Sequence, residues 1–318
     1  MKKNIYINSQ GGLGFNLALA HVIPELKQIY EKVCVISPYS DVFECCESVD
    51  YVYKVNEMRD FIFDAKHDDA KLICERMYDS EDFIYKKLSY ADAWRKACNL
   101  PLKNNKAGSD TKANLCPSKY FPLSKTQADD YINDILSRGF DNFVIMQFEG
   151  GQTPLIQVPL DKDGKQDWSK IPTNYDNEPL KRHYPFGKAE KFIKLFRQKH
   201  PRTAIVLYQL PNEHKYTETF EREIPYLAYY EMAKSPKCKG TVSIDSSLQH
   251  LVAGVTKSLV VWGHSLPDSF GYEYNKNIIQ KCNRDDILYF SALGPSGARI
   301  DYISPEDLLE ETDKYIFG

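Results

Sequence analysis

Short apolar runs alternate with segments of helical spacing along most of the chain. Residues 4–8 form a β-rich run that ends in a glycine turn at 11–14, and apolar positions then recur at helical spacing over 15–30. Apolar runs at 33–36 and 51–55 predict two more strands. A strand, a glycine turn, a helix and a further strand in this order are typical of a parallel sheet with helices on its faces.

The rest of the chain continues this alternation after a less regular middle. Residues 56–105 are predicted to be mostly helical, and the polar stretch 103–119 to be a loop or linker. The later expected elements are, in order, helix 125–137, strand 143–148, helix 187–199, strand 204–208, helix 226–234 and a strand–turn–helix–strand unit at 241–263. Residues 152–180 are rich in Pro, Asp and Lys and predict a long loop or insertion.

This pattern predicts two α/β halves with a cleft between them. A length of 318 residues supports two domains, because a single core rarely organises so long a chain. We expect an N-terminal domain at 1–138, a C-terminal domain at 139–303, and a last helix at 304–318, for which packing back on the N-terminal domain is one arrangement. Ligands of such folds bind at the carboxyl ends of the strands.

Composition and charge exclude several classes of protein. Apolar residues make up 42%, charged residues 27%, and the formal net charge is −3, which argues against a broad nucleic-acid-binding surface but leaves a local basic groove open. No apolar run approaches the roughly 18 residues of a membrane span. Residues 1–3 run directly into a strand without a signal peptide, and the eight scattered cysteines suit free thiols. A cytoplasmic protein is expected, with any contact to the inner membrane peripheral.

Polar side chains crowd the turn after the strand that begins near residue 241. Asp245, Ser246, Ser247, Gln249 and His250 stand where a strand-to-helix turn needs one cap. Ser246 or Ser247 could cap the helix, free backbone N–H groups there would point at a phosphate, and His250 could donate to a diphosphate oxygen. A capped turn with a partly buried histidine is the alternative interpretation.

The glycine turn near the N-terminus is a second candidate. Gly11, Gly12 and Gly14 follow a strand and open a helix, so the backbone there could approach an anionic ligand closely. A tight turn with no ligand explains them equally well. The spacing is neither a dinucleotide fingerprint nor a P-loop. A dinucleotide oxidoreductase is disfavoured further, because the second strand gives way to Ser37 and Pro38 rather than to a ribose-binding acid.

Two further clusters are expected at the mouth of the cleft. Lys181, Arg182 and His183 precede the helix at 187–199 and suit a polyanion, although a solvated loop also explains them. Glu213 follows the strand at 204–208 and could bind sugar or ribose hydroxyls, or be an exposed loop acid.

Three stretches give the sequence a family resemblance. "IDSSLQHLVAGVTKSLVVWGHSLPDSFG" resembles the D-[ST]-G-x-x-H-x-A-A segment of the ADP-heptose:lipopolysaccharide heptosyltransferases, glycosyltransferase family 9. "KRHYPFGKAEKFI" resembles that family's K-x-[WY]-P segment, and "GGLGFNLALAHVIPEL" resembles its opening loop and helix. The resemblance implies a GT-B fold, in which two Rossmann-like parallel-sheet domains face a central cleft. It covers most of the chain except the middle and residues 152–180.

The resemblance also implies a nucleoside-diphosphate sugar donor, held mainly by the C-terminal half. Asp245, Ser246 and His250 would occupy donor-binding positions, with Ser247 standing where the family has glycine. Arg182 would face phosphate and Glu213 the nucleoside. No metal or other cofactor is expected, because a basic side chain and a helix N-terminus would neutralise the leaving diphosphate.

The catalytic base departs from the family pattern. Family members carry an aspartate just after the glycine, proposed to deprotonate the acceptor hydroxyl, whereas this chain has Phe15 and Asn16 there. Asn16 is kept as a residue of the phosphate or acceptor loop with Gly11, Gly12 and Gly14. His21 lies too deep on the first helix to reach an acceptor. Glu149, after the strand at 143–148, is the favoured base, with Asp161 and Asp163 as alternatives.

The expected function is that of an inverting glycosyltransferase that moves a sugar to a hydroxyl acceptor, in bacterial surface glycan synthesis of the lipopolysaccharide kind. A sugar transferase acting on hydroxylated nucleic-acid bases is one alternative. A binding protein that keeps the donor pocket without catalysis is another, since the aspartate is absent.

Overall fold

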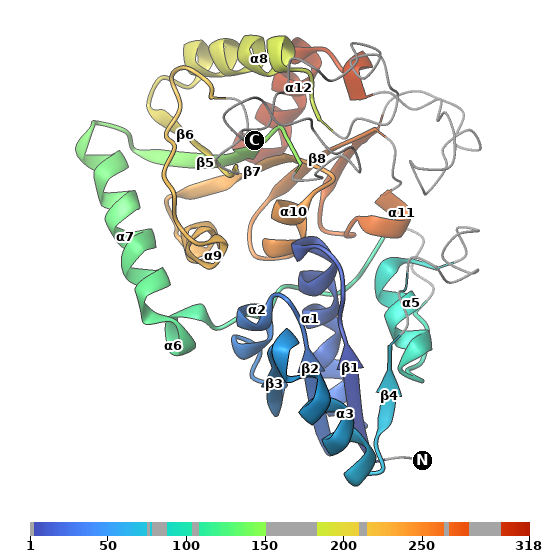
Figure 1. Cartoon of the computed structure of the whole chain (residues 1–318). Coiled ribbons are helices and arrows are strands. Elements are labelled where there is room, and N and C mark those ends of the chain that lie inside the picture. Colours follow the sequence, from blue (N-terminus) through green and yellow to red (C-terminus); the bar gives the residue numbers. More distant parts are fainter. Residues whose placement is uncertain are drawn as a thin grey trace, which may run out of the picture.

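The computed structural model describes residues 3–74, 77, 88–103, 108–150, 183–209, 215–263, 267–279 and 300–318. The expected loop at 152–180 lies outside these residues. The described chain forms two parallel sheets, each covered by helices, which lie one above the other in Figure 1.

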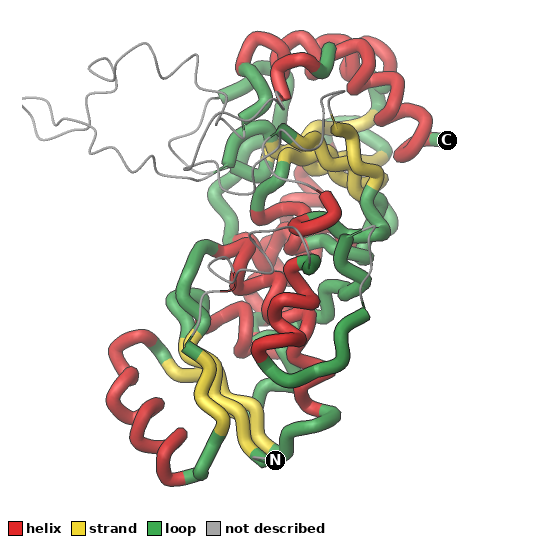
Figure 2. Tube along the Cα trace, turned by 90° about the vertical axis from the view of Figure 1, so that its right-hand side faces the viewer, coloured by secondary structure: helices red, strands yellow, loops and turns green. Residues whose placement is uncertain are grey.

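The N-terminal sheet has the strand order β3-β2-β1-β4 and is parallel throughout. Its strands are β1 (Asn4–Asn8), β2 (Lys32–Ile36), β3 (Tyr51–Tyr53) and β4 (Lys71–Ile73). Alternate side chains face opposite sides. Ile5 joins the core beneath α1 (Leu13–Lys27), and Tyr6 joins Phe61 of α3 (Met58–His67) on the other face. Figure 2 shows α3 alone on its side of this sheet.

The C-terminal sheet has the order β6-β5-β7-β8-β9 and is also parallel. Its strands are β5 (Asn142–Gln147), β6 (Thr203–Leu207), β7 (Cys238–Ile244), β8 (Ser258–Trp262) and β9 (Lys276–Ile279). One face packs on α8 (Phe186–Lys199), where Val144 and Phe192 share a cluster. The opposite face packs on α9 (Tyr226–Lys234), where Ile145 and Met232 share another. Strands β5, β6 and β8 and most of β7 are buried on both faces, as is typical of parallel sheets, while the edge strand β9 is half-buried.

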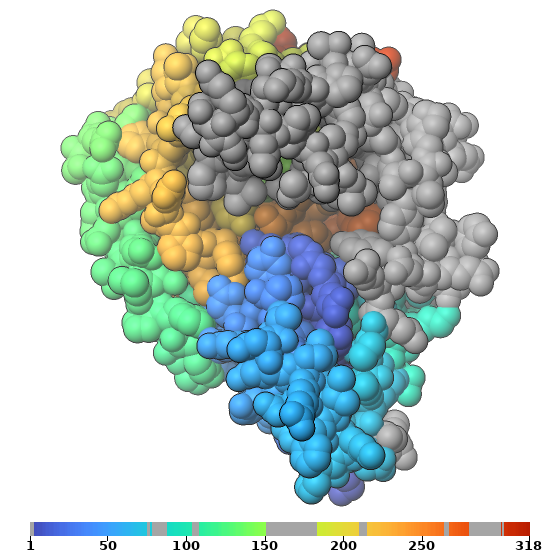
Figure 3. Space-filling view, viewed as in Figure 1, coloured from blue at the N-terminus to red at the C-terminus, as the bar shows by residue number. Residues whose placement is uncertain are grey.

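The two halves meet through α1 and the short helix α10 (Ser247–Leu251). Leu248 and Leu251 of α10 belong to the same buried apolar cluster as Leu17 and Val22 of α1. Figure 3 shows the blue N-terminal half pressed against orange residues of the C-terminal half. The apolar core is therefore continuous from one half to the other.

Residues 108–113, here called the strap, carry the chain across to the C-terminal half. The Ser109 N–H donates to the Gly271 carbonyl at 2.8 Å, and the Glu273 N–H donates to the Ser109 carbonyl at 3.0 Å. Further along, the Ala113 N–H donates to the Ala253 carbonyl at 2.8 Å. The strap thus packs as an extended segment on the C-terminal half, although it precedes residue 139, where that half was expected to begin.

After the strap come α6 (Pro117–Tyr120) and α7 (Pro122–Ser137), which precede the expected domain boundary at residue 138. Both helices nevertheless pack on α9 in the C-terminal half. Tyr131 of α7 is buried in the cluster that contains Tyr229 of α9, and its ring lies under the Arg222 guanidinium. Because α6 and α7 pack on α9, they belong to the C-terminal half, which therefore begins well before residue 138.

The elements expected from periodicity are present, with one correction in the middle of the chain. The middle, expected to be mostly helical, contains α3 and α5 (Tyr90–Ala97) but also the edge strand β4. β4 has three residues, of which only Leu72 and Ile73 are apolar, so it forms no apolar run of the kind that predicted β3. The remaining short elements are α2 (Ser40–Glu44), η1 (Val55–Glu57), α11 (Pro267–Phe270), η7 (Ile300–Tyr302) and a π-helical turn, η8 (Asp313–Phe317).

The last helix, α12 (Pro305–Thr312), begins as predicted, because the Ser304 hydroxyl accepts a hydrogen bond from the Asp307 N–H at 3.1 Å. The expectation that this helix packs on the N-terminal domain is wrong. Leu308 and Ile316 join the cluster of Phe192 and Phe196 beneath α8, in the C-terminal half. The apolar face of α12 therefore packs within the C-terminal half, to which α12 is adjacent in sequence.

Candidate functional site

The turn between β7 and α10 is capped from a neighbouring strand. Ser246 is the N-cap residue, but its side chain makes no capping bond, so the predicted serine cap is wrong. Gln147, at the end of β5, accepts from the Leu248 N–H at 3.3 Å and donates to Ser246 Oγ at 3.2 Å. β5 pairs with β7 and sets Gln147 opposite Ser243, which brings the amide within reach of the turn. One N–H that was expected to face a phosphate is thus already used.

The other polar side chains of this turn also have partners within the protein. Asp245 is buried, and its Oδ1 accepts from Gln249 Nε2 at 2.6 Å, one helical turn further on. The Ser247 hydroxyl lies 3.2 Å from the Tyr208 hydroxyl, which follows β6. The crowding noticed in the sequence therefore belongs to a network that fixes the turn between the ends of β5, β6 and β7.

His250 of α10 reaches the N-terminal half. Its Nδ1 lies 2.8 Å from the Tyr272 hydroxyl, which in turn lies 3.3 Å from Nδ1 of His21 on α1. All three side chains are buried. Burial, with a smaller contribution from His250, lowers the pKa of His21 to about 3, so this imidazole is neutral.

The glycine turn lies directly against His250. A Cβ added to Gly14 would come within 2.8 Å of His250 Cδ2 and 3.4 Å of its Nε2. Gly11 has φ +139°, which favours glycine, and packs on the Phe15 ring. A side chain added to Gly12 would meet nothing within 4 Å. The two candidates predicted from sequence, the glycine turn and the polar turn, therefore lie side by side.

Asn16 holds the glycine turn from beneath. Its Nδ2 donates to the carbonyls of Gly11 and Gly12 at 3.3 and 3.0 Å, and its Oδ1 accepts from the hydroxyls of Ser9 and Ser37, both at 2.7 Å. The side chain is fully buried. Asn16 supports the shape of the turn through bonds within the protein.

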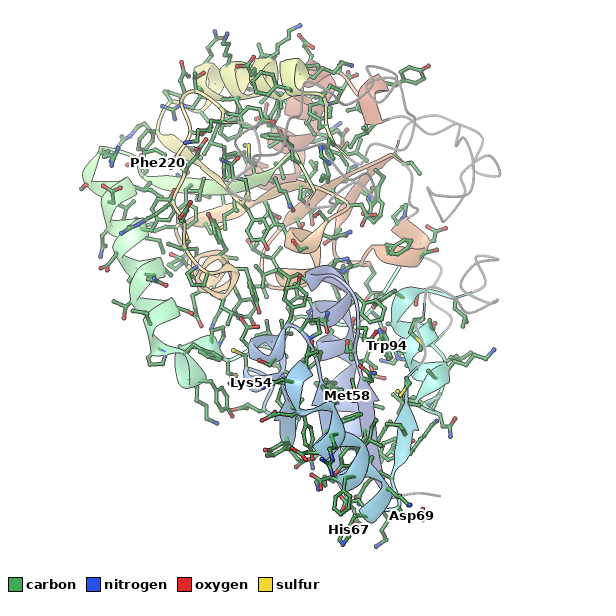
Figure 4. The ribbon with its side chains drawn as sticks, in the orientation of Figure 1. Lys54, Met58, His67, Asp69, Trp94 and Phe220 are labelled. Atoms are coloured by element: carbon green, nitrogen blue, oxygen red, sulfur yellow. The ribbon has the colours of Figure 1, made fainter. Side chains whose placement is uncertain are left out.

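Phe15 stands in an aromatic core. Its ring centroid lies 5.5 Å from that of Tyr90 and 5.3 Å from that of Trp94, both on α5. Figure 4 labels Trp94, which lies between α5 and α1. Phe15 is 4% exposed. At the position where the family that the sequence resembles has an aspartate, this chain thus has a phenylalanine that packs in an aromatic core.

Glu149 follows β5 at the same sheet edge as Gln147. It is 8% exposed, and its Oε1 accepts from the Tyr216 hydroxyl at 3.1 Å. The next residue, Gly150, approaches Ser246, because a Cβ there would lie 3.4 Å from Ser246 Oγ. Glu149 therefore sits beside the polar turn.

Several predicted residues lie outside the described part of the chain. These are Arg182, Glu213, Asp161 and Asp163. Their expected roles stay predictions.

Sequence reasoning missed Gln147 and Tyr272. Gln147 carried a faint signal, since it is a polar residue at the end of an otherwise apolar strand, followed two residues later by Glu149. Tyr272 carried none, because its partners His250 and His21 are 22 and 251 residues away.

Among the described residues, no group of three or more His, Cys, Asp or Glu side chains could hold a metal ion. The same part of the chain holds seven cysteines, all free thiols, of which only Cys74 is exposed. None of its helices has the length and apolar character to cross a bilayer.

Comparison with known proteins places the fold. A family 9 glycosyltransferase from Veillonella parvula superposes with a TM-score of 0.63 at 11% identity, over 99% of this chain and 98% of that one. E. coli ADP-heptose LPS heptosyltransferase II gives 0.61 at 13% identity over the same shares. E. coli heptosyltransferase WaaC with ADP gives 0.55 at 11%, over 98% and 99%. The predicted GT-B architecture, two facing parallel-sheet α/β domains, is confirmed.

No protein-family model matches the sequence, and no curated protein gives a significant match.

Proposed function

We propose that this protein is a glycosyltransferase that takes its sugar from a nucleoside diphosphate. The observation that carries the proposal is the contact between the two candidate turns, where His250 of the C-terminal half lies against Gly14 of the N-terminal half. Ligands of open α/β sheets bind at the carboxyl ends of the strands. Asp245 and Glu149 follow β7 and β5 at those ends, which supports a donor seated beside them.

The finer assignment is an inverting transfer to a hydroxyl of a bacterial surface glycan. The solved structures of similar fold include enzymes named for ADP-heptose and LPS, which makes an ADP-linked heptose the first donor to test. Asp245, Ser246, Ser247 and His250 would hold the donor, with Arg182 at the phosphates and Glu213 at the nucleoside. No metal is required if Arg182 neutralises the leaving diphosphate.

Donor binding is tested by thermal shift against ADP-, UDP- and GDP-sugars. A ligand at about 100 times its Kd stabilises the folded chain by about 2.7 kcal/mol, which is a rise of roughly 5 °C in Tm. We expect ADP-sugars to give this rise. Absence of a shift with every nucleotide sugar would contradict the proposal.

Two charge-removing variants make that test specific. Asp245→Asn should reduce the shift, because it alters the carboxylate that accepts from Gln249 at the polar turn. Asp134→Asn, on the outer face of α7 where the carboxylate pairs with Arg138, removes the same charge far from this turn and should leave the shift unchanged.

Glu149 is the proposed base that deprotonates the acceptor. It is a buried carboxylate beside the polar turn, oriented by the Tyr216 hydroxyl. Glu149→Gln keeps the side chain's shape and should lower transfer about a hundredfold or more while donor affinity is retained. The readout is release of nucleoside diphosphate in the presence of acceptor. Glu310→Gln, on the exposed face of α12, is the matched control, and turnover by Glu149→Gln at the control's rate would remove Glu149 from the mechanism.

A non-catalytic nucleotide-sugar binding protein is the second candidate. It is favoured by Phe15, which fills the family's aspartate position with a ring packed between Tyr90 and Trp94. Donor binding without transfer or hydrolysis, in the wild type and with crude acceptor extracts present, would select this candidate.

A further inference from the structure

Gln147 makes two hydrogen bonds to the polar turn, and the chemistry of its partners sets their directions. Its side-chain amide lies 3.3 Å from the Leu248 nitrogen and 3.2 Å from Ser246 Oγ. A backbone N–H can only donate, so the amide oxygen of Gln147 faces Leu248. The amide nitrogen, which also can only donate, therefore faces Ser246, and Ser246 Oγ accepts this bond.

The Ser246 hydroxyl thus keeps its own proton for another partner, since a hydroxyl carries one proton besides the lone pairs with which it accepts. The side chain of Ser246 makes no second hydrogen bond within the part of the chain that the structure describes. Ser246 is half-buried and lies just after β7, at the carboxyl edge of the sheet. Its proton is therefore available to an acceptor atom of a ligand.

Capping explains why this hydroxyl is released. The oxygen of an N-cap serine ordinarily turns back to accept the N–H of the second or third helical residue. Leu248 is the second residue of α10, and its N–H already donates to Gln147. Gln147 is 4% exposed and lies opposite Ser243 in the pairing of β5 with β7, so the sheet fixes its position. The helix is thus capped from the sheet, and the oxygen of Ser246 is not needed for that task.

The backbone after β5 also passes close to this hydroxyl. A Cβ added to Gly150 would lie 3.4 Å from Ser246 Oγ and 3.7 Å from Ser246 Cβ. With glycine at this position, no side chain of residue 150 stands against the hydroxyl.

We infer that Gln147 is a positioning residue: it caps α10 in place of Ser246 and thereby holds the Ser246 hydroxyl as a hydrogen-bond donor for a ligand at the polar turn. A hydroxyl whose oxygen already accepts an N–H suits a ligand atom that only accepts, such as a diphosphate oxygen. The directions of the two bonds are independent of the ligand, whereas the diphosphate rests on the proposed function.

The direction of the bond to position 246 is read without any ligand from the thiol that Ser246→Cys introduces. Cysteine is alkylated as the thiolate, so the pH midpoint of its reaction with iodoacetamide, followed at this residue by peptide mass spectrometry, reports the ionisation of the thiol. An amide N–H that donates to the sulfur stabilises the thiolate. We expect Gln147→Met, added to Ser246→Cys, to raise the midpoint by about one pH unit.

Two further variants complete this comparison. Gln147→Asn keeps an amide but is one methylene shorter, and it should raise the midpoint as well. Gln127→Met removes the same kind of amide from α7, outside the polar turn, and should leave the midpoint unchanged. A midpoint that falls in Gln147→Met would mean that Gln147 accepts from position 246, and an unchanged midpoint would mean that no bond joins the two side chains. Either result would overturn the inference.

ADP binding by calorimetry tests the role of the hydroxyl. We expect Ser246→Ala and Gln147→Met each to weaken ADP binding roughly tenfold, since a hydrogen bond to a charged oxygen is lost. The double variant should bind no more weakly than either single one, because Gln147 acts through the Ser246 hydroxyl. Ser243→Ala removes a buried hydroxyl that has no hydrogen-bond partner within the described residues, and it should leave the affinity unchanged.

The outcomes separate this inference from the proposed function. A wild type that binds none of ADP, UDP and GDP contradicts the diphosphate assignment, whereas the alkylation midpoints still decide whether Gln147 donates to position 246. Additive losses in the double variant, or an undiminished ADP affinity in Gln147→Met, would overturn the positioning role.

Discussion

Gly14 lacks a side chain at a point where the other half of the molecule needs the space. Gly14→Ala would set a methyl group 2.8 Å from His250 Cδ2, so the ring or the helix must move. Overpacking of this kind costs about 1–3 kcal/mol. We expect reduced stability in urea unfolding together with a loss of ADP affinity, because the displaced ring is the one held by Tyr272.

Gly12→Ala is the control for that variant. It adds the same methyl group two residues earlier in the same turn, where nothing lies within 4 Å. Stability in urea unfolding should stay near that of the wild type. An equal loss of stability in both variants would mean that any methyl group in the turn is destabilising, whether or not it contacts His250.

At the residue scale, the sequence identified the residues of the two candidate turns but not the residues that they contact. The polar turn and the glycine turn were both singled out as candidates that follow a strand, with a ligand-free tight turn left open at the glycines, but the approach of His250 to Gly14 was not expected. Ser246 or Ser247 was expected to cap α10, yet Gln147 does so from β5. Such partners come from distant segments, and no local pattern encodes them.

At the scale of elements, Arg95 joins α1, α5 and the strap. Its guanidinium donates to Glu25 of α1 at 2.7 Å, to Asp92 of α5 at 3.0 Å and to Asp110 of the strap at 2.7 Å. Lys103 pairs with Glu25 and Asp110 from the outside. Arg95 and Asp92 are each 1% exposed, so these charges depend on one another.

Arg95→Met should therefore be costly. Removing one partner of a buried ion pair leaves the other charge uncompensated and costs about 3–5 kcal/mol. Urea unfolding at pH 7 measures the loss. Lys103→Met removes the exposed member of the same cluster, 48% exposed, and should cost at most about 1 kcal/mol. A similar loss in the two variants would show that burial does not set the energy of this cluster.

The same cluster predicts a pH dependence. Burial alone would raise the pKa values of Glu25 and Asp110, but hydrogen bonds and charge from Arg95 and Lys103 outweigh it and hold both below their usual values. Depressed carboxyl pKa values stabilise the folded state above the unfolded values, near pH 4, and this contribution is lost as the pH falls through the folded ones. The difference in stability between the wild type and Arg95→Met should thus narrow below about pH 4.

Elements with a full hydrophobic period were predictable, whereas the short edge strands β4 and β9 were not, although the equally short β3 was expected from the apolar run at 51–55. Helix α9 was expected at 226–234 and lies there, because its apolar residues repeat over more than two turns. β4 and β9 have three and four residues, and their strand character comes from pairing with β1 and β8.

At the scale of the whole molecule, the order of the sequence and the order of packing differ. The strap binds Ala253 and Gly271 through backbone groups, and these bonds depend on carbonyls that the sequence pattern cannot locate. A boundary at residue 138 follows from where the second α/β pattern starts. The crossing of the chain at 108–113 depends on tertiary hydrogen bonds, which no local sequence pattern predicts.

The packing of α7 on α9 has a consequence for how the chain is made. A ribosome synthesises α7 before any strand of the C-terminal sheet, and domains fold as their segments emerge. The buried side chains Ala128, Tyr131 and Ile135 therefore lack their packing against α9 until residues 226–234 leave the ribosome. During that interval the nascent chain carries an amphipathic helix with its apolar face uncovered, which chaperones can hold until the second half is complete.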